Sequence, residues 1–169
     1  MRGITGAIAL VSTLAAFHPA RAQGADYLAF GDHAKDVARI ANSIGTCKSL
    51  GYDVDDRPQV LDELRDIALR TAVMADVDRQ TAETMLVDAL KREQSDAEFM
   101  TSLPAHIDTR EKLVVRFRET MSFWNDRCGA LASGDLGSRY VRKGANQPAA
   151  YEAVLQSAIA RIEEASSPN

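Results

Sequence analysis

The sequence predicts an all-α fold: a single-domain bundle of four main helices with short helical turns, held by one disulfide between helices. Apolar residues recur at steps of three and four along most of the chain, which is the period of an amphipathic helix. No stretch shows the sustained alternation of apolar and polar residues that is typical of a strand. Two cysteines, Cys47 and Cys128, stand far enough apart to join two helices.

The first 22 residues have the pattern of a secretory signal peptide. Arg2 gives a positive start, an apolar run extends from Ile4 to Phe17, and small residues precede the predicted cut after Ala22. The run is about 14 residues long, shorter than the roughly 20 that a membrane-spanning helix needs. We therefore favour a cleaved signal peptide over an N-terminal membrane anchor. No later stretch approaches that length, so no membrane span is expected.

The remaining residues, 23–169, fit a single helical domain. A chain of 147 residues has the size of an ordinary domain, and it buries about two thirds of its unfolded surface without needing a metal ion to fold. Without Arg2 and Arg21 it carries 18 basic and 24 acidic residues, a net charge of −6. A nucleic-acid-binding protein would show a basic surface, so this class is excluded.

The two cysteines predict a structural disulfide. Both lie in the part that is predicted to be exported, and exported proteins meet an oxidising compartment in which disulfides persist. Two cysteines allow one intramolecular pairing, Cys47–Cys128. The alternative, a catalytic thiolate, would need a histidine as its base, and only His33 and His106 lie in this part.

Helix boundaries are predicted from caps, glycines and prolines. Asp32 is expected to cap the first helix, and Gly51 to close it in the left-handed conformation with Tyr52 folded back near Cys47. A capping box at 95–98 predicts a separate short helical turn. The expected elements are helices at 32–50, from 58 to near 75, from 76 or 78 onward, at 95–100, from 108 to about 132, and from 146 to about 165.

The strongest periodic signal marks the longest helix, which is expected to begin at a capping box of Asp108 and Glu111. Its apolar seam places Trp124 in the core and Cys128 one turn from the helix end. The seam residues are Val114, Phe117, Met121, Trp124, Cys128 and Leu131. The second helix is expected to bury Val60, Leu61, Leu64, Ile67, Ala68 and Thr71.

An acidic cluster at Asp53, Asp55 and Asp56 raises the question of a calcium loop. Such a loop needs a glycine at its sixth position and a carboxylate at its twelfth, where this chain has Pro58 and Leu64. We therefore interpret the cluster as the solvated start of a helix. The two histidines of this part are 73 residues apart, so no metal site and no cofactor are predicted.

Motifs of known catalytic sites are missing from the sequence. There is no glycine-rich phosphate loop, no Gly-x-Ser-x-Gly turn, no His-Glu-x-x-His pair and no Cys-x-x-Cys-His haem attachment. Among 24 acidic residues some pair is always close, so paired carboxylates alone do not indicate a hydrolase. An enzyme is therefore not predicted.

A glycine-containing connector at 133–147 is the one segment that suggests a binding surface. It surrounds an aromatic residue with basic ones, and Tyr and Arg are common anchors of interfaces. The residues expected to contact a partner are Arg139, Tyr140, Arg142 and Lys143. In the alternative interpretation, Leu136, Tyr140 and Val141 simply close the end of the core.

These observations predict an exported, periplasmic protein (or a secreted one, if the source has no outer membrane) that acts as a binding or interaction module. An unknown protein partner is possible under this hypothesis. The alternatives are a small-ligand carrier with a pocket between helices, and an acid- or stress-type periplasmic chaperone that exposes apolar surface when its carboxylates are protonated. A concave pocket with converging polar groups would favour the carrier.

Overall fold

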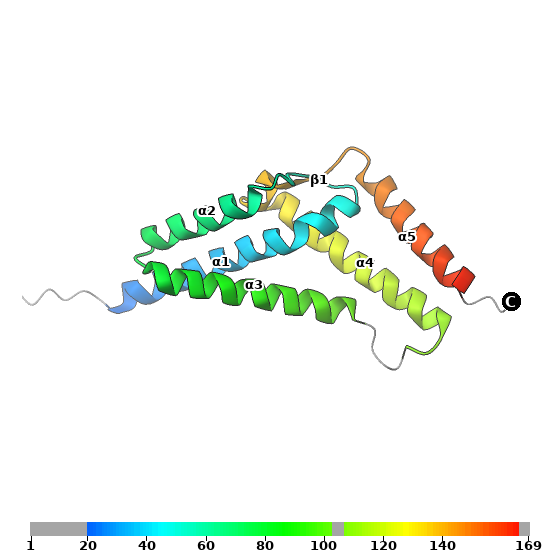
Figure 1. Cartoon of the computed structure of the whole chain (residues 1–169), viewed down its shortest axis with the longest axis horizontal. Coiled ribbons are helices and arrows are strands. Elements are labelled where there is room, and N and C mark those ends of the chain that lie inside the picture. Colours follow the sequence, from blue (N-terminus) through cyan, green and yellow to red (C-terminus); the bar gives the residue numbers. More distant parts are fainter. Residues whose placement is uncertain (1–19, 103–106, 166–169) are drawn as a thin grey trace, which may run out of the picture.

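The computed structural model describes residues 20–102 and 107–165, and these residues are almost entirely helical (Figure 1). The predicted all-α fold is confirmed, and the described residues form five helices. The elements are α1 (Ala20–Ser49), β1 (Asp53–Val54), α2 (Val60–Met74), α3 (Arg79–Thr101), α4 (Arg110–Ser133), the 3-10 turn η1 (Gly137–Arg139), β2 (Val141–Arg142) and α5 (Gln147–Ala165).

The helices are arranged as a three-helix body with a helical pair attached to it. α1 packs between α2 and α3, which also touch each other (Figure 1). α4 crosses the C-terminal part of α1, and α5 runs back along α4 in the opposite direction (Figure 1). Where α1, α2 and α3 meet, buried alanines such as Ala38, Ala68 and Ala82 allow the helix axes to approach closely.

The first helix begins at Ala20, twelve residues before the predicted start at Asp32. Asp32 is exposed and pairs with Lys35 one turn later, so its side chain does not cap a helix. The helix extends on the N-terminal side of Asp32 because its buried apolar stripe also extends that way, to Phe30, which is fully buried. Residues 1–19 of the predicted signal peptide lie outside the described residues, and the predicted cut after Ala22 falls within the first turn of α1.

The end of α1 confirms the prediction made from Gly51. Gly51 is left-handed with φ +84°, and the Tyr52 amide donates to the Cys47 carbonyl at 3.1 Å. Tyr52 is buried beside the helix end, as expected. A side chain at Gly51 would also overlap Ala150 of α5, so the site needs glycine for two reasons.

The turn between α2 and α3 repeats this closure with a non-glycine residue. Asp76 has φ +51°, and the amide of the buried Val77 donates to the Ala72 carbonyl. Asp78, one of the two predicted cap residues, then caps α3 by accepting a hydrogen bond from the Thr81 amide at 3.0 Å. The predicted stripe of α2 is wrong at one position, because Leu61 points outward, whereas Ala72 is buried instead.

The separate helical turn predicted at 95–100 does not form, because α3 continues unbroken to Thr101. The predicted cap residues lie within the last two turns of this helix, where Gln94 donates to Glu98 along its exposed face. The last carbonyls of α3 accept hydrogen bonds from side chains of α4. The Arg116 guanidinium donates to the Met100 carbonyl at 2.9 Å, and the Thr120 hydroxyl donates to the same carbonyl. A neighbouring helix thus satisfies the end of α3.

The predicted longest helix forms as α4, and its cap is Thr109 rather than Asp108. The Thr109 hydroxyl accepts from the Lys112 amide at 3.3 Å, while Asp108 pairs with the Lys112 ammonium. The predicted seam is confirmed in its C-terminal half, where Trp124 is 8% exposed. The buried seam residues are Met121, Trp124, Cys128 and Leu131.

Two short strands that the sequence pattern does not reveal tie the connector to the body. β1 pairs antiparallel with β2, with Val54 opposite Val141. Two residues are too few to show alternation, so no periodic signal could predict them. No helix within 20–102 or 107–165 is long and apolar enough to cross a membrane.

Candidate functional site

A cavity of about 450 Å³ lies where α1, α2, the end of α4 and the connector after α4 meet. We call it the polar pocket, because ionisable side chains converge on it from two segments almost one hundred residues apart. These are His33, Asp36 and Arg39 from α1, and Asp135 and Arg139 from the connector. The apolar side chains that line it are Ile40, Ile67, Ala130, Leu131 and Leu136.

His33 is held in the wall of the polar pocket by a hydrogen bond to α2. The Thr71 hydroxyl donates to the Ile67 carbonyl at 3.0 Å. The same hydroxyl oxygen lies 3.2 Å from the Nε2 atom of His33, so the hydroxyl faces this nitrogen with its lone pairs. This arrangement assigns the imidazole proton to Nε2. Burial lowers the pKa of His33, and the nearby Asp36 opposes this shift only in part, so the imidazole is neutral at pH 7.

Arg39 connects the polar pocket to the interior. Its guanidinium lies 3.8 Å from the carboxylate of Asp36 and donates to Glu93 of α3 at 3.2 Å. Because Arg39 already has two carboxylates beside it, its charge is largely neutralised within the protein.

Behind Arg39 lies a buried polar network that joins α1, α3 and α4. The side chains of Glu93 and Arg127 are each 9% exposed and form an ion pair. Arg127 also donates to the hydroxyl of the fully buried Ser43 at 2.8 Å. Its guanidinium lies over the rings of Trp124 and Phe123, with centroids 5.5 and 6.0 Å away.

Sequence reasoning missed this network because it assigned charged residues to the surface. One signal could have revealed it: Glu93 falls one turn after Ala89 and Leu90, on the same stripe of α3 that is buried. Arg127 likewise directly precedes Cys128 on the buried side of α4. A charged residue on a buried apolar stripe needs a partner of opposite charge. Glu93 and Arg127 are such partners for each other.

The connector that forms one wall of the polar pocket is fixed against α4. A side chain at Gly137 would overlap the Leu131 carbonyl, so this close approach requires glycine. The Ser138 amide donates to the Gly134 carbonyl at 2.9 Å, and the Arg139 amide donates to Leu136. Asp135 and Arg139 therefore project from a backbone with defined geometry.

The predicted partner-binding residues lie in different environments. Tyr140 is 5% exposed and closes the core together with Val141. Its backbone carbonyl accepts a hydrogen bond from the backbone amide of Asp55. Lys143 is exposed. Arg142 forms an ion pair with Asp53 at 3.0 Å, and Arg139 lines the polar pocket. The partner-binding loop stays a prediction, without the Tyr140 ring as an accessible anchor.

The acidic cluster of the sequence is neutralised by basic side chains. Within 20–102 and 107–165, no group of three or more His, Cys, Asp or Glu residues is placed to hold a metal ion. Hydrogen bonds from Arg57 hold the pKa of Asp55 below its usual value. The ion pairs are Asp53 with Arg142, Asp55 with Arg57, and Asp56 with Lys48.

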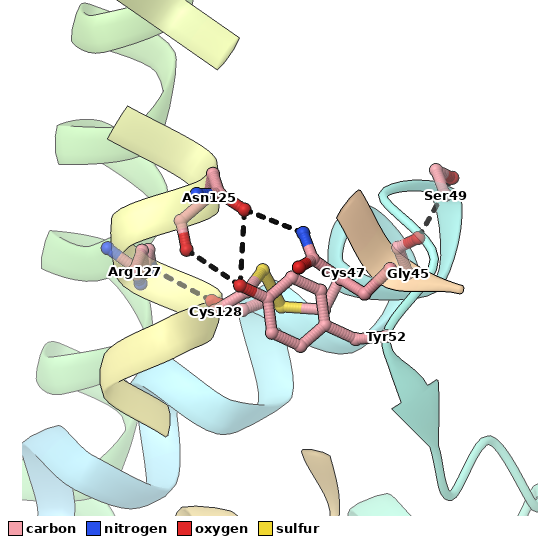
Figure 2. The surroundings of a disulfide bond; sticks show 9 residues. Gly45, Cys47, Ser49, Tyr52, Asn125, Arg127 and Cys128 are labelled. Atoms are coloured by element: carbon pink, nitrogen blue, oxygen red, sulfur yellow. Dashed lines mark hydrogen bonds between the residues drawn. A yellow bond between two sulfur atoms is a disulfide. The ribbon is translucent and has the colours of Figure 1, made fainter. Parts of the chain in front are cut away.

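The predicted disulfide between Cys47 and Cys128 is confirmed, and both residues are completely buried. Figure 2 shows the polar contacts that surround it. The Tyr52 hydroxyl lies 3.1 Å from the backbone carbonyl and 3.2 Å from the side-chain oxygen of Asn125. That side-chain oxygen also accepts from Gln147 at 2.8 Å. The ends of α1, α4 and α5 are therefore fastened at one point.

An apolar groove of about 520 Å³ runs between α2 and α3. Leu61 and Val87 lie on it, 59% and 47% exposed, and an ion pair between Arg65 and Glu83 crosses its edge. Nothing in the described structure indicates what would cover this groove.

Comparison with protein-family models, with curated proteins and with solved structures finds no match for this chain.

Proposed function

We propose that this chain is an exported binding protein that carries a small molecule in the polar pocket. The observation that supports this proposal is the convergence of five ionisable side chains on one concave, partly apolar cavity. Its volume of about 450 Å³ falls within the range of roughly 300–1,000 Å³ of small-molecule sites. This is the carrier that the sequence left as an alternative to an interaction module.

Two features favour the polar pocket over another cavity of similar size. A cavity of about 490 Å³ between α1 and α3 also includes Arg39, but two helices alone form its walls. Four segments, α1, α2, α4 and the connector, form the polar pocket. The exposed Arg139 of the connector belongs to this pocket, so the charge that suggested a partner-binding loop has a role in the carrier as well.

The proposed activity is binding without a chemical step. The described residues that line the polar pocket include no serine, threonine, cysteine, lysine or tyrosine that could act as a nucleophile. His33, Asp36 and Asp135 could accept a proton, but none of the hydroxyl, thiol or amine nucleophiles named above lines the pocket with them. Recognition of a ligand by charge and shape is what these residues support.

Filling the polar pocket tests the proposal. Ala130 of α4 lines the pocket, so Ala130→Trp would occupy it without changing a charge. Compounds from a small-molecule library are expected to raise the melting temperature of the wild type but not of this variant. A ligand at one hundred times its dissociation constant stabilises a protein by about 2.7 kcal/mol, which is easily measured.

Ala153→Trp is the matched control, because Ala153 is exposed on α5 and lines none of the cavities described above. It should respond to ligands as the wild type does. A library without any stabilising compound, or compounds that stabilise Ala130→Trp equally, would contradict the proposal.

Export to the periplasm forms part of the same proposal. A buried disulfide persists in an oxidising compartment, which supports a location outside the cytoplasm. Mass spectrometry of the exported protein is expected to give a chain that begins at Gln23 and is two mass units lighter than the dithiol form. A chain that retains residues 1–22, or that has a free thiol at Cys47, would show that this part is wrong.

A further inference from the structure

The ionisable side chains of the polar pocket fall into two groups. Those on α1 already have partners: Arg39 pairs with Glu93 and lies near Asp36, and His33 is bonded to Thr71. A ligand gains little from these groups, because their charges or hydrogen bonds are satisfied inside the protein.

The two charges on the connector differ in this respect. Asp135 and Arg139 are exposed, and within the described parts of the chain neither forms an ion pair, with the other or with a third residue. The backbone holds both in place, because η1 is fixed against the Leu131 carbonyl through Gly137. The pocket therefore offers one negative and one positive group that a ligand can pair with.

The remainder of the lining is apolar. Ile40, Ile67, Leu131 and Leu136 surround the charged groups, and they come from α1, α2, α4 and the connector. A ligand with an apolar body would bury surface against them, while its charged groups stay at the connector.

We infer that the polar pocket binds a zwitterion with an apolar body, such as a free aliphatic or aromatic amino acid or a dipeptide of these. The carboxylate pairs with Arg139 and the ammonium with Asp135. A simple anion would pair with Arg139 but place its charge beside the unneutralised Asp135, and a simple cation would meet the reverse situation. This inference rests on the proposed function, and it specifies the ligand class of that site.

Blocking one ligand charge at a time tests the inference. The probes are free leucine, phenylalanine and their dipeptides, each compared with its N-acetyl form, which lacks the ammonium, and its amide, which lacks the carboxylate. Isothermal titration calorimetry on the full chain should show binding of the zwitterions. Each blocked form should bind at least about tenfold more weakly, because one charge-assisted hydrogen bond is lost.

Two variants assign the charges to residues. Arg139→Gln should weaken the zwitterion about tenfold or more, yet should not weaken the amide, whose ammonium no longer lies beside a guanidinium. Asp135→Asn should weaken the zwitterion equally but should not weaken the N-acetyl form, whose charge no longer lies beside a carboxylate. Lys143→Gln, in the same connector but outside the pocket, is the control and should bind as the wild type does.

Three results would overturn the inference. In the first, the zwitterions do not bind at any concentration up to their solubility limit. In the second, the N-acetyl forms bind as tightly as the zwitterions. In the third, neither Arg139→Gln nor Asp135→Asn changes the binding of the zwitterions. If library compounds of another class bind the wild type but not Ala130→Trp, the carrier proposal stands and only the ligand class is wrong. If no compound binds at all, the carrier proposal fails together with it.

Discussion

Replacing Glu93 by leucine is expected to lower the free energy of unfolding by about 3–5 kcal/mol. The change leaves the Arg127 guanidinium, 9% exposed, without a carboxylate among the described residues. Its remaining contacts, Ser43 and the two aromatic rings, cannot replace the lost counter-charge. Urea unfolding followed by circular dichroism measures the loss.

The double variant Glu93→Leu, Arg127→Met separates the ion pair from ordinary packing. Removing both charges leaves no buried ion, so the double variant should be more stable than the sum of the two single losses implies, by at least about 1 kcal/mol. Arg118→Ala on the exposed side of α4 is the control, with an expected loss under about 0.5 kcal/mol. Additive losses, or a small loss for Glu93→Leu, would mean that the network does not hold the three helices together.

Replacing both cysteines by alanine is expected to lower stability by up to about 4.5 kcal/mol. The disulfide closes a loop of 81 residues, and the chain-entropy model gives this value for a loop of that length. The measurement is urea unfolding of the oxidised wild type and of Cys47→Ala, Cys128→Ala, each with and without reductant.

Because both cysteines are completely buried, the native wild type should resist reductant until it unfolds. Reductant should then lower the unfolding midpoint of the wild type toward that of the double variant, which should itself be insensitive to reductant. A double variant as stable as the oxidised wild type would show that the other contacts at this point already fix α1 against α4.

Local patterns predicted much of the fold. The seam that contains Trp124 and Cys128 identified α4, and Gly51 predicted how α1 ends, because both depend on residues close in sequence. The start of α1 was misplaced because Asp32 is a good cap residue in isolation, whereas burial of Phe30 extends the helix beyond it. Tertiary packing here overrides a local preference.

The candidate site was much less accessible to sequence reasoning. Its two charged walls come from α1 and from the connector after α4, and nothing in the spacing of His33 or Arg139 indicates that they share a cavity. The sequence did single out Arg139, but as part of a surface loop with Tyr140. The alternative interpretation, in which Tyr140 closes the core, is confirmed, because β1 and β2 draw the connector onto the body.

The position of the disulfide also determines how this chain would respond to a mechanical load on its two ends. The bond links the last turn of α1 to the last part of α4, so α2, α3 and most of α4 lie inside a closed covalent ring. Force travels through the bond and bypasses that ring. About 270–290 Å of extended chain, from 81 residues at roughly 3.3–3.6 Å each, is thereby protected from stretching. The segments outside the ring are α1 up to Cys47, the end of α4, the connector and α5, so these could be drawn out while α2 and α3 stay unstretched.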